Sequence, residues 1–245
     1  SLLYILWVIG FFMFSNIKAV IFDLDGTLYD FKNLPQRLIW AMPTHVLRLG
    51  ADRKVRKDLK GCDFGSPEEY KEEYSKRMSK KTNLSPKDAL TWYSTYYMGT
   101  MAFLLRRFYS ARPKLAEVFS YINKKGLKIA VFSDYPRVKQ RIWSLNFSDE
   151  TMATISGSYS AEDFGSQKPA SRPFLEIADK LGVKPEECLV VGDRDDTDGE
   201  GARKTGMSFI QIETHKTKVL EPNHPVWSWD DFAEWVLSGM EPLED

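Results

Sequence analysis

Two carboxylates stand two residues apart in the run Phe22-Asp23-Leu24-Asp25-Gly26-Thr27-Leu28. The run follows an apolar stretch, residues 17–22, so we expect it at the carboxyl end of a buried strand, where open α/β sheets bind ligands. In an extended segment, residues i and i+2 point to the same side. Adjacent like charges are costly unless a cation or a shared proton offsets them. We interpret the pair as a metal site with a nucleophilic carboxylate; the alternative is a strand that enters an ordinary Asp-Gly turn.

Three later stretches also contain side chains that could take part in catalysis: a hydroxyl, a lysine and several carboxylates. They are the apolar run Ile129-Ala130-Val131-Phe132-Ser133, the pair Lys168-Pro169 with Phe174 six residues after the lysine, and Val190-Val191-Gly192-Asp193 followed by Asp195, Asp196 and Asp198. In this order and spacing, the four stretches resemble the motifs of the haloacid dehalogenase superfamily of phosphotransferases. The resemblance covers residues 17–30 and about 113–215. The segment between them matches only as a generic helical insertion.

Strand and helix patterns alternate through the second half of the chain. The predicted strands are residues 129–133, 189–192 and 208–212, and the predicted helices are residues 114–125, 137–145, 172–181 and 199–205. Alternation of this kind favours an α/β fold with a parallel sheet and helices on both faces. With the resemblance, the expected fold is a three-layer, doubly wound, Rossmann-like core with an inserted α-helical cap.

The expected organisation has three parts. Residues 1–16 form an apolar N-terminal extension, residues 17–30 and 113–245 form the catalytic core, and residues 31–112 form the helical cap. The cap segment has no convincing strand run, and its prolines mark helix starts or breaks. It holds 17 Lys and Arg against 8 Asp and Glu, a net charge of +9 opposite −9 for the remainder. This separation suits a phosphorylated substrate over a cation, although solvated helix faces would also explain it.

The resemblance implies a Mg²⁺-dependent phosphatase that hydrolyses a small phosphomonoester through an aspartyl-phosphate. By that resemblance, Asp23 is the nucleophile, and Asp25 is the general acid and then the general base. Asp23, the backbone carbonyl of Asp25, and Asp193 would hold Mg²⁺. The second carboxylate argues against dehalogenation, because the dehalogenases of the superfamily lack it.

The same resemblance assigns supporting roles. Ser133 would donate to a phosphoryl oxygen, Lys168 would neutralise charge on Asp23 and the phosphoryl group, and Thr27 would tie the loop after the first strand and meet phosphate. Asp198 is expected as a second-shell or water-mediated metal ligand, with Asp196 as its competitor.

Three neighbours of these residues carry smaller expectations. Asp195 is expected on the surface, and Arg194 is expected to pair with one of the nearby acids. Asp134 departs from the family, which often has a neutral residue there. It is expected to face away from phosphate, to meet a cationic substrate group, or to cap the helix past Pro136.

Composition narrows the class of partner and compartment. The 245-residue chain has zero formal net charge, which suggests no polyanionic partner such as nucleic acid. Cys62 and Cys188 lie far apart without metal-ligand spacing, which favours a reducing, cytoplasmic setting. The partner that the resemblance implies is a small phosphorylated metabolite.

The apolar segment Leu2 to Phe14 is the anomaly. It is shorter than the about 20 residues of a membrane span, and it lacks the basic region of a signal peptide. A non-native extension, an extra element that packs on the core or on another subunit, and the remnant of a membrane anchor stay open, and so do oligomers. The alternative functions are a phosphomutase of the same fold and a catalytically idle binding or scaffold protein.

Overall fold

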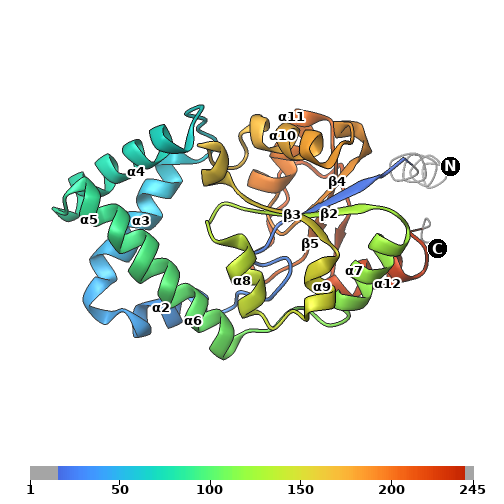
Figure 1. Ribbon diagram of the computed structural model, residues 1–245, viewed down its shortest axis with the longest axis horizontal. Coiled ribbons are helices and arrows are strands. Elements are labelled where there is room, and N and C mark those ends of the chain that lie inside the picture. Colours follow the sequence, from blue (N-terminus) through green and yellow to red (C-terminus); the bar gives the residue numbers. More distant parts are fainter. Residues whose placement is uncertain (1–15, 241–245) are drawn as a thin grey trace.

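A six-stranded, fully parallel sheet forms the centre of the larger part of the molecule (Figure 1). The computed structural model describes residues 16–240. The strand order is β3-β2-β1-β4-β5-β6. The strands are β1 (Ala19–Phe22), β2 (Lys128–Ser133), β3 (Ile155–Ser160), β4 (Cys188–Gly192), β5 (Ser208–Ile212) and β6 (Val226–Trp227). The predicted α/β fold with a parallel sheet is therefore confirmed.

Helices cover both faces of the sheet because alternate strand residues point to opposite sides. In β1, Val20 and Phe22 join one hydrophobic cluster, and Ala19 and Ile21 join another. The first face is covered by α7 (Leu115–Lys124), α8 (Val138–Ser144), α9 (Asp149–Ala153) and α12 (Trp229–Leu237). The second face is covered by α10 (Ser171–Leu181) and α11 (Glu200–Thr205), with the short turns η3 (Ala161–Phe164) and η4 (Pro185–Glu187) beside them. Figure 1 shows these as the lower and upper layers.

The predicted central strands agree with the structure to within one residue, as β2, β4 and β5. Four elements near the sheet edges or the chain end were not predicted: β3, β6, α9 and α12. The edge strand β3 is mostly half-buried and reads Ile-Ser-Gly-Ser-Tyr-Ser. A strand that is covered on only part of its surface does not need the continuous apolar run that marks a buried parallel strand.

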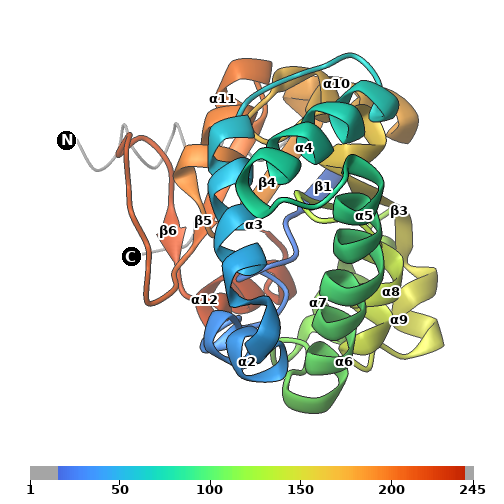
Figure 2. The ribbon, with the colours of Figure 1, turned by 90° about the vertical axis from the view of Figure 1, so that its left-hand side faces the viewer.

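The insertion between β1 and β2 is helical, as predicted. It consists of α2 (Leu34–Ala41), η1 (Pro43–His45), α3 (Val46–Leu59), α4 (Pro67–Thr82), α5 (Pro86–Thr91), the π-helical turn η2 (Trp92–Tyr97) and α6 (Met98–Phe108). Its apolar side chains form a hydrophobic cluster of their own. Figures 1 and 2 show this helical layer beyond the carboxyl ends of the strands. We refer to these helices and their loops as the cap.

Backbone hydrogen bonds join the cap to the core. Residues 60–66, the α3–α4 loop, run antiparallel to residues 165–168 of the core. The bonds are Gly61 N to Lys168 O at 3.1 Å, Gln167 N to Cys62 O at 3.0 Å and Phe64 N to Gly165 O at 2.9 Å. Arg172 of the core also pairs with Asp63 of the cap at 2.5 Å. The cap is thus fastened directly to the loop that carries Lys168.

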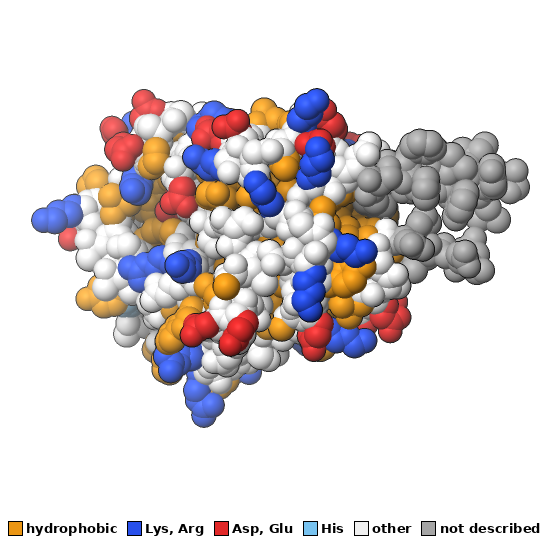
Figure 3. All heavy atoms as spheres, turned by 45° about the vertical axis from the view of Figure 1, so that its right-hand side comes forward, with side chains coloured by type: hydrophobic (Ala, Val, Ile, Leu, Met, Phe, Trp, Pro, Cys, Tyr) orange, Lys and Arg blue, Asp and Glu red, His pale blue; other side chains and the backbone are white. Residues whose placement is uncertain are grey.

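The surface in Figure 3 mixes charges of both signs with hydrophobic side chains. On that face, the basic and acidic side chains therefore do not separate into one positive and one negative patch. No helix between residues 16 and 240 is both long and apolar enough to cross a membrane. The apolar segment Leu2 to Phe14 lies outside the described residues.

Candidate active site

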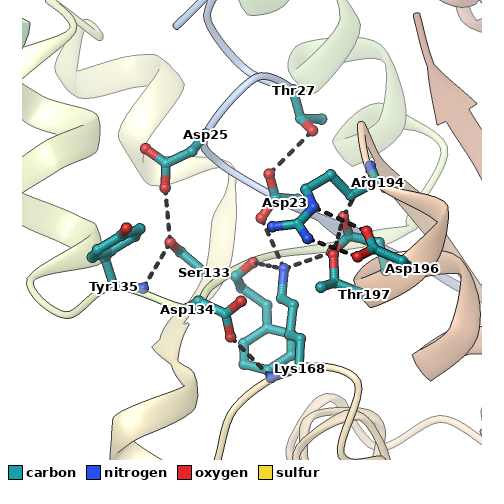
Figure 4. Close-up of polar contacts among 12 residues, drawn as sticks. Asp23, Asp25, Thr27, Ser133, Asp134, Tyr135, Lys168, Arg194, Asp196 and Thr197 are labelled. Atoms are coloured by element: carbon teal, nitrogen blue, oxygen red, sulfur yellow. Dashed lines mark hydrogen bonds and ion pairs between the residues drawn. The ribbon is translucent and has the colours of Figure 1, made fainter. Parts of the chain in front are cut away.

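The predicted site residues meet at the carboxyl edge of the sheet because three neighbouring parallel strands end there (Figure 4). Asp23 follows β1, Ser133 ends β2 and Asp193 follows β4. The sheet order changes direction around β1, which is the position where open α/β sheets bind ligands. Lys168 enters from the loop before α10, and Asp198 from the π-helical turn η5 (Asp195–Gly199).

Lys168 lies at the centre of the polar contacts and is only 3% exposed. Its Nζ donates to Asp23 Oδ1 at 2.8 Å, to Asp198 Oδ1 at 2.7 Å and to the carbonyl of Phe132 at 2.7 Å. Burial alone would lower the pKa of Lys168, but the neighbouring carboxylates outweigh burial and raise that pKa above its usual value. Lys168 is therefore a fixed cation beside Asp23.

Asp23, Asp193 and Asp198 form a buried acidic cluster. Each offers one carboxylate oxygen, and these oxygens lie within 4.8 Å of one another. Burial raises the pKa of Asp23 to about 7 against the opposing effect of Lys168. Burial and the charges of Asp23 and Asp198 raise the pKa of Asp193 well above its usual value. Lys168 offsets only part of the negative charge of these three carboxylates, and clustered carboxylate oxygens are ligands that suit a hard divalent cation.

Gly26 permits the close approach of the first-strand loop to this cluster. A Cβ atom at Gly26 would lie 2.5 Å from Asp193 Oδ2, and the backbone φ of +95° is one that glycine adopts readily. Thr27 donates from Oγ1 to Asp23 Oδ2 at 3.2 Å. Arg112, which the sequence reasoning missed, donates to the carbonyls of Gly26 and Thr27. The loop that follows Asp23 is thus held by the side-chain bond from Thr27 to Asp23 and by the bonds from Arg112 to its backbone.

Asp25 turns away from Asp23 and toward Ser133 (Figure 4). Its Oδ2 accepts from Ser133 Oγ at 3.1 Å, and its Oδ1 accepts from Tyr29 and Arg141. Burial would raise the pKa of Asp25, but Arg141, Tyr29 and Ser133 together lower it. Asp25 is accordingly a carboxylate in the resting protein.

Asp134 does not cap the N-terminus of the helix that follows Pro136, which was one of its expected roles. Its Oδ1 accepts from the backbone N–H of Lys168 at 2.9 Å. The cap role is wrong, because α8 begins at Val138 after Arg137 and has no side-chain cap. The carboxylate at this unusual position therefore holds the lysine loop in place.

The expectation that Asp195 lies on the surface is also wrong. Asp195 is 1% exposed, pairs with Arg203, and accepts from the backbone N–H groups of Leu220 and Glu221 at 2.6 and 3.1 Å. A run of four acidic or polar residues gives no sign of which one points inward; the π-helical turn η5 sets that direction.

Asp196 points outward from the same turn. It pairs with Arg194 at 2.8 Å and with Lys60 of the cap. Arg194 therefore has the predicted kind of acidic partner. Asp198, rather than Asp196, lies in the buried acidic cluster.

We expect Asp195→Asn to destabilise the protein by about 1–3 kcal/mol, because a buried acceptor of several hydrogen bonds loses its charge. Asp196→Asn is the matched control from the same turn, and its exposed ion pairs predict a change within about 0.5 kcal/mol. Urea denaturation of both variants measures the difference. Equal stabilities for the two variants would show that the contacts of Asp195 do not support the fold.

Comparison with known proteins places the chain among hydrolases. The sequence model of the haloacid dehalogenase-like hydrolase family matches residues 17–206. A glyceraldehyde 3-phosphate phosphatase of Methanopyrus kandleri is 27% identical over 244 residues, covering 94% of this chain and 96% of the relative. A phosphoglycolate phosphatase of Aquifex aeolicus is 26% identical over 200 residues, covering 77% of this chain and 81% of the relative.

Solved structures with the same fold include enzymes of two kinds. The HAD phosphatase of Thermococcus onnurineus aligns with a TM-score of 0.55 at 18% identity, covering 93% of this chain and all of that chain. A 2-haloacid dehalogenase of Pseudomonas syringae aligns with a TM-score of 0.62 at 18% identity, covering 91% and 98%. At such identities the likeness establishes the fold, and the chemistry has to be argued from the site.

Proposed function

Because the chain belongs to the haloacid dehalogenase-like hydrolase family, we propose that it is a phosphatase that hydrolyses a small phosphomonoester through phosphorylation of Asp23. The observation that carries the proposal is the pairing of Asp23 with the buried Lys168, while a second carboxylate, Asp25, contacts Ser133. A nucleophile, a fixed cation and a proton carrier are the three parts that this chemistry requires. The phosphatase names of the relatives agree with an enzyme that hydrolyses phosphate esters.

In the first step, a carboxylate oxygen of Asp23 attacks phosphorus, and the bond from phosphorus to the alcohol oxygen breaks. Asp25 gives a proton to the departing oxygen. A phosphate dianion beside Ser133 adds negative charge next to Asp25, which favours the protonated carboxyl needed for this step. Lys168 offsets the charge that gathers on the transferred group.

In the second step, water attacks the phosphorus of phosphorylated Asp23. Asp25, now a carboxylate, takes a proton from that water, and the bond from phosphorus to Asp23 breaks. Inorganic phosphate leaves and Asp23 returns to its starting state. One residue thus serves first as acid and then as base.

The acidic cluster fits a divalent cation, and we propose Mg²⁺. Asp23 and Asp193 would hold it with the backbone carbonyl of Asp25, and Asp198 would support it from its bond to Lys168. When bound, Mg²⁺ supplies positive charge that offsets the clustered carboxylates and the phosphoryl oxygens.

Asp193→Asn should raise the Mg²⁺ concentration needed for half-maximal activity at least tenfold and lower the maximal rate, because a neutral amide replaces a charged ligand. Asp196→Asn, from the exposed side of the same segment, is the control and should change both by less than twofold. The stabilisation of melting temperature by Mg²⁺ gives a second readout, independent of turnover, and should shrink only in Asp193→Asn. Equal Mg²⁺ responses in the two variants would remove Asp193 from the metal site.

The substrate we propose is a small phosphorylated metabolite, in keeping with the relatives that act on glyceraldehyde 3-phosphate and phosphoglycolate by name. Lys60 is a cap cation that reaches the acidic segment of the core, through its pair with Asp196. Arg106 and Arg107 instead lie over the rings of Trp143 and Phe108. We therefore propose Lys60 as a cap residue that contacts the substrate's non-reacting end.

A screen of triose, sugar, nucleotide and carboxylic-acid phosphates, with and without Mg²⁺, tests the proposed function. We expect release of inorganic phosphate from small phosphomonoesters and from 4-nitrophenyl phosphate only when Mg²⁺ is present. Absence of phosphate release across the whole panel would contradict the proposal and favour the binding or scaffold alternative.

A further inference from the structure

Arg141 is a fully buried cation inside the proposed site that no sequence motif singled out. It enters from α8 and is 0% exposed. One terminal nitrogen, Nη2, donates to Asp25 Oδ1, and the other, Nη1, donates to Ser133 Oγ at 3.0 Å and to the carbonyl of Tyr135 at 3.3 Å. A single guanidinium therefore contacts both the proposed proton carrier and the proposed phosphoryl-binding hydroxyl.

Helical spacing explains why Arg141 points inward. Val138, Arg141, Ile142 and Leu145 follow the i, i+3, i+4, i+7 pattern of one helix face, and all four are buried. An arginine in an apolar stripe is costly to desolvate unless a carboxylate and further acceptors compensate it. Asp25 supplies that carboxylate, so the guanidinium of Arg141 lies in the proposed site and not in solvent.

The planar guanidinium also fixes geometry. Its two terminal nitrogens lie at a set separation, so acceptors bound to both are held at a defined spacing. Here the two acceptors are Asp25 Oδ1 and Ser133 Oγ, one on the loop after β1 and the other at the end of β2. Ser133 also accepts from the backbone N–H of Tyr135 at 3.1 Å, so it retains an anchor without Arg141. Among residues 16–240, Arg141 is the cation that pairs with Asp25, whose other side-chain partners are Tyr29 and Ser133.

We propose that Arg141 is a positioning residue that orients Asp25 for proton transfer to the leaving oxygen. This inference rests on the proposed phosphatase function. It predicts that Arg141 acts through Asp25 and not through the phosphoryl group. The alternative is a direct phosphoryl contact, for which the buried Nε of Arg141, without a hydrogen-bond partner among the described residues, would be available.

Substrates with different leaving groups separate these two roles. Nitrophenolate leaves without a proton, whereas an alkoxide needs one, and general acid catalysis is worth roughly 10²–10⁴-fold. We expect Arg141→Gln to lower kcat/KM about a hundredfold for the best alkyl phosphate of the panel but only about threefold for 4-nitrophenyl phosphate. Arg141→Lys keeps the positive charge but lacks the two terminal nitrogens of the guanidinium, and it should show the same leaving-group dependence in weaker form.

A double-mutant cycle with Asp25→Asn is the decisive test. If Arg141 acts through Asp25, adding Arg141→Gln to Asp25→Asn should lower kcat/KM for the alkyl phosphate by less than about twofold. The double variant also removes both charges of the buried pair, so it keeps the test available if Arg141→Gln alone folds poorly. Lys139→Gln, on the exposed side of the same helix, is the matched control and should behave as the unaltered protein.

Three results would overturn the inference. Equal losses for aryl and alkyl substrates in Arg141→Gln, or multiplicative losses in the double variant, would assign Arg141 to the phosphoryl group. An unaltered kcat/KM for both substrates would remove it from the reaction. Failure of the unaltered protein to hydrolyse any phosphate ester would instead contradict the proposed function itself, and the inference with it.

Discussion

Asp23→Asn is expected to abolish turnover, with a loss of at least about a thousandfold in kcat, because an amide cannot form the phosphorylated intermediate. Asp23 is buried and accepts from Lys168 at 2.8 Å, so its carboxylate lies directly beside the fixed cation that the transferred group needs. Steady-state assays with 4-nitrophenyl phosphate measure the loss. The control is Asp30→Asn, an exposed acid on the same loop. Turnover near that of the unaltered protein would contradict a covalent mechanism at Asp23.

Asp23→Asn should also change how the stability of the protein depends on pH. The same melting curves show whether the variant is folded. Burial raises the pKa of Asp23 from 3.8 to about 7, so the native state binds a proton that the unfolded chain has released. Stability of the metal-free protein should therefore fall as the pH rises from 3.8 through about 7. Asp23→Asn lacks this ionisation and should show a smaller fall over that range. Melting temperatures measured in a chelator across the range test this sign.

Lys168→Met is expected to have the second-largest effect, and it acts on stability and activity together. The substitution leaves Asp23, Asp198 and the carbonyl of Phe132 without their shared donor. Loss of one member of a buried ion pair costs about 3–5 kcal/mol. Loss of a cation beside the transferred group costs about 10²–10³ in kcat.

Lys180→Met, an exposed lysine on α10, is the control for Lys168→Met. Urea denaturation and phosphate release measure both variants. Mg²⁺ should recover part of the stability of Lys168→Met, because a bound cation would offset the same carboxylates. A Lys168→Met protein with the stability and kcat of the control would show that the buried lysine has neither role.

The sequence predicted the parts of the fold that carry continuous apolar runs. The strands β2, β4 and β5 are buried on both faces, so most of their residues are apolar and the strand pattern can be recognised in the sequence. Helix ends were also marked in the sequence by glycine, which commonly ends a helix at positive φ. Gly126 and Gly182 adopt φ of 76° and 66° just beyond the ends of α7 and α10. The edge strand β3 lacked such a signal because its neighbours cover only part of it.

The proposed site was predicted where the motif itself supplies the side chain. Asp23, Asp193 and Lys168 follow strand ends or precede a helix, and the topology brings them together. Arg141 and Asp195 were missed or misplaced, because their inward direction depends on tertiary structure. Arg141 did leave a trace in the sequence, as a charged residue in the apolar stripe of a predicted helix.

Individual side chains of the cap contact the core close to the proposed site. The net charge of +9 on residues 31–112 was interpreted as suited to a phosphorylated substrate over a cation, and that interpretation stays a prediction. The contacts themselves are particular ones: Arg56 of the cap pairs with Glu162 of the core and donates to the carbonyl of Asp134. The bond to Asp134 ends on the residue after Ser133, and two bonds of the α3–α4 loop end on Gln167 and Lys168, so cap position and site geometry are linked.

Trapping the phosphorylated enzyme tests the central claim most directly. The protein is mixed with radiolabelled 4-nitrophenyl phosphate, whose leaving group needs no proton, and Mg²⁺. It is quenched in acid within milliseconds and digested for peptide mapping. We expect label on the peptide that contains Asp23, increased in Asp25→Asn because the second step is slowed, and absent in Asp23→Asn. Phosphate release by the unaltered protein without any label on that peptide, in Asp25→Asn as well, would contradict the account.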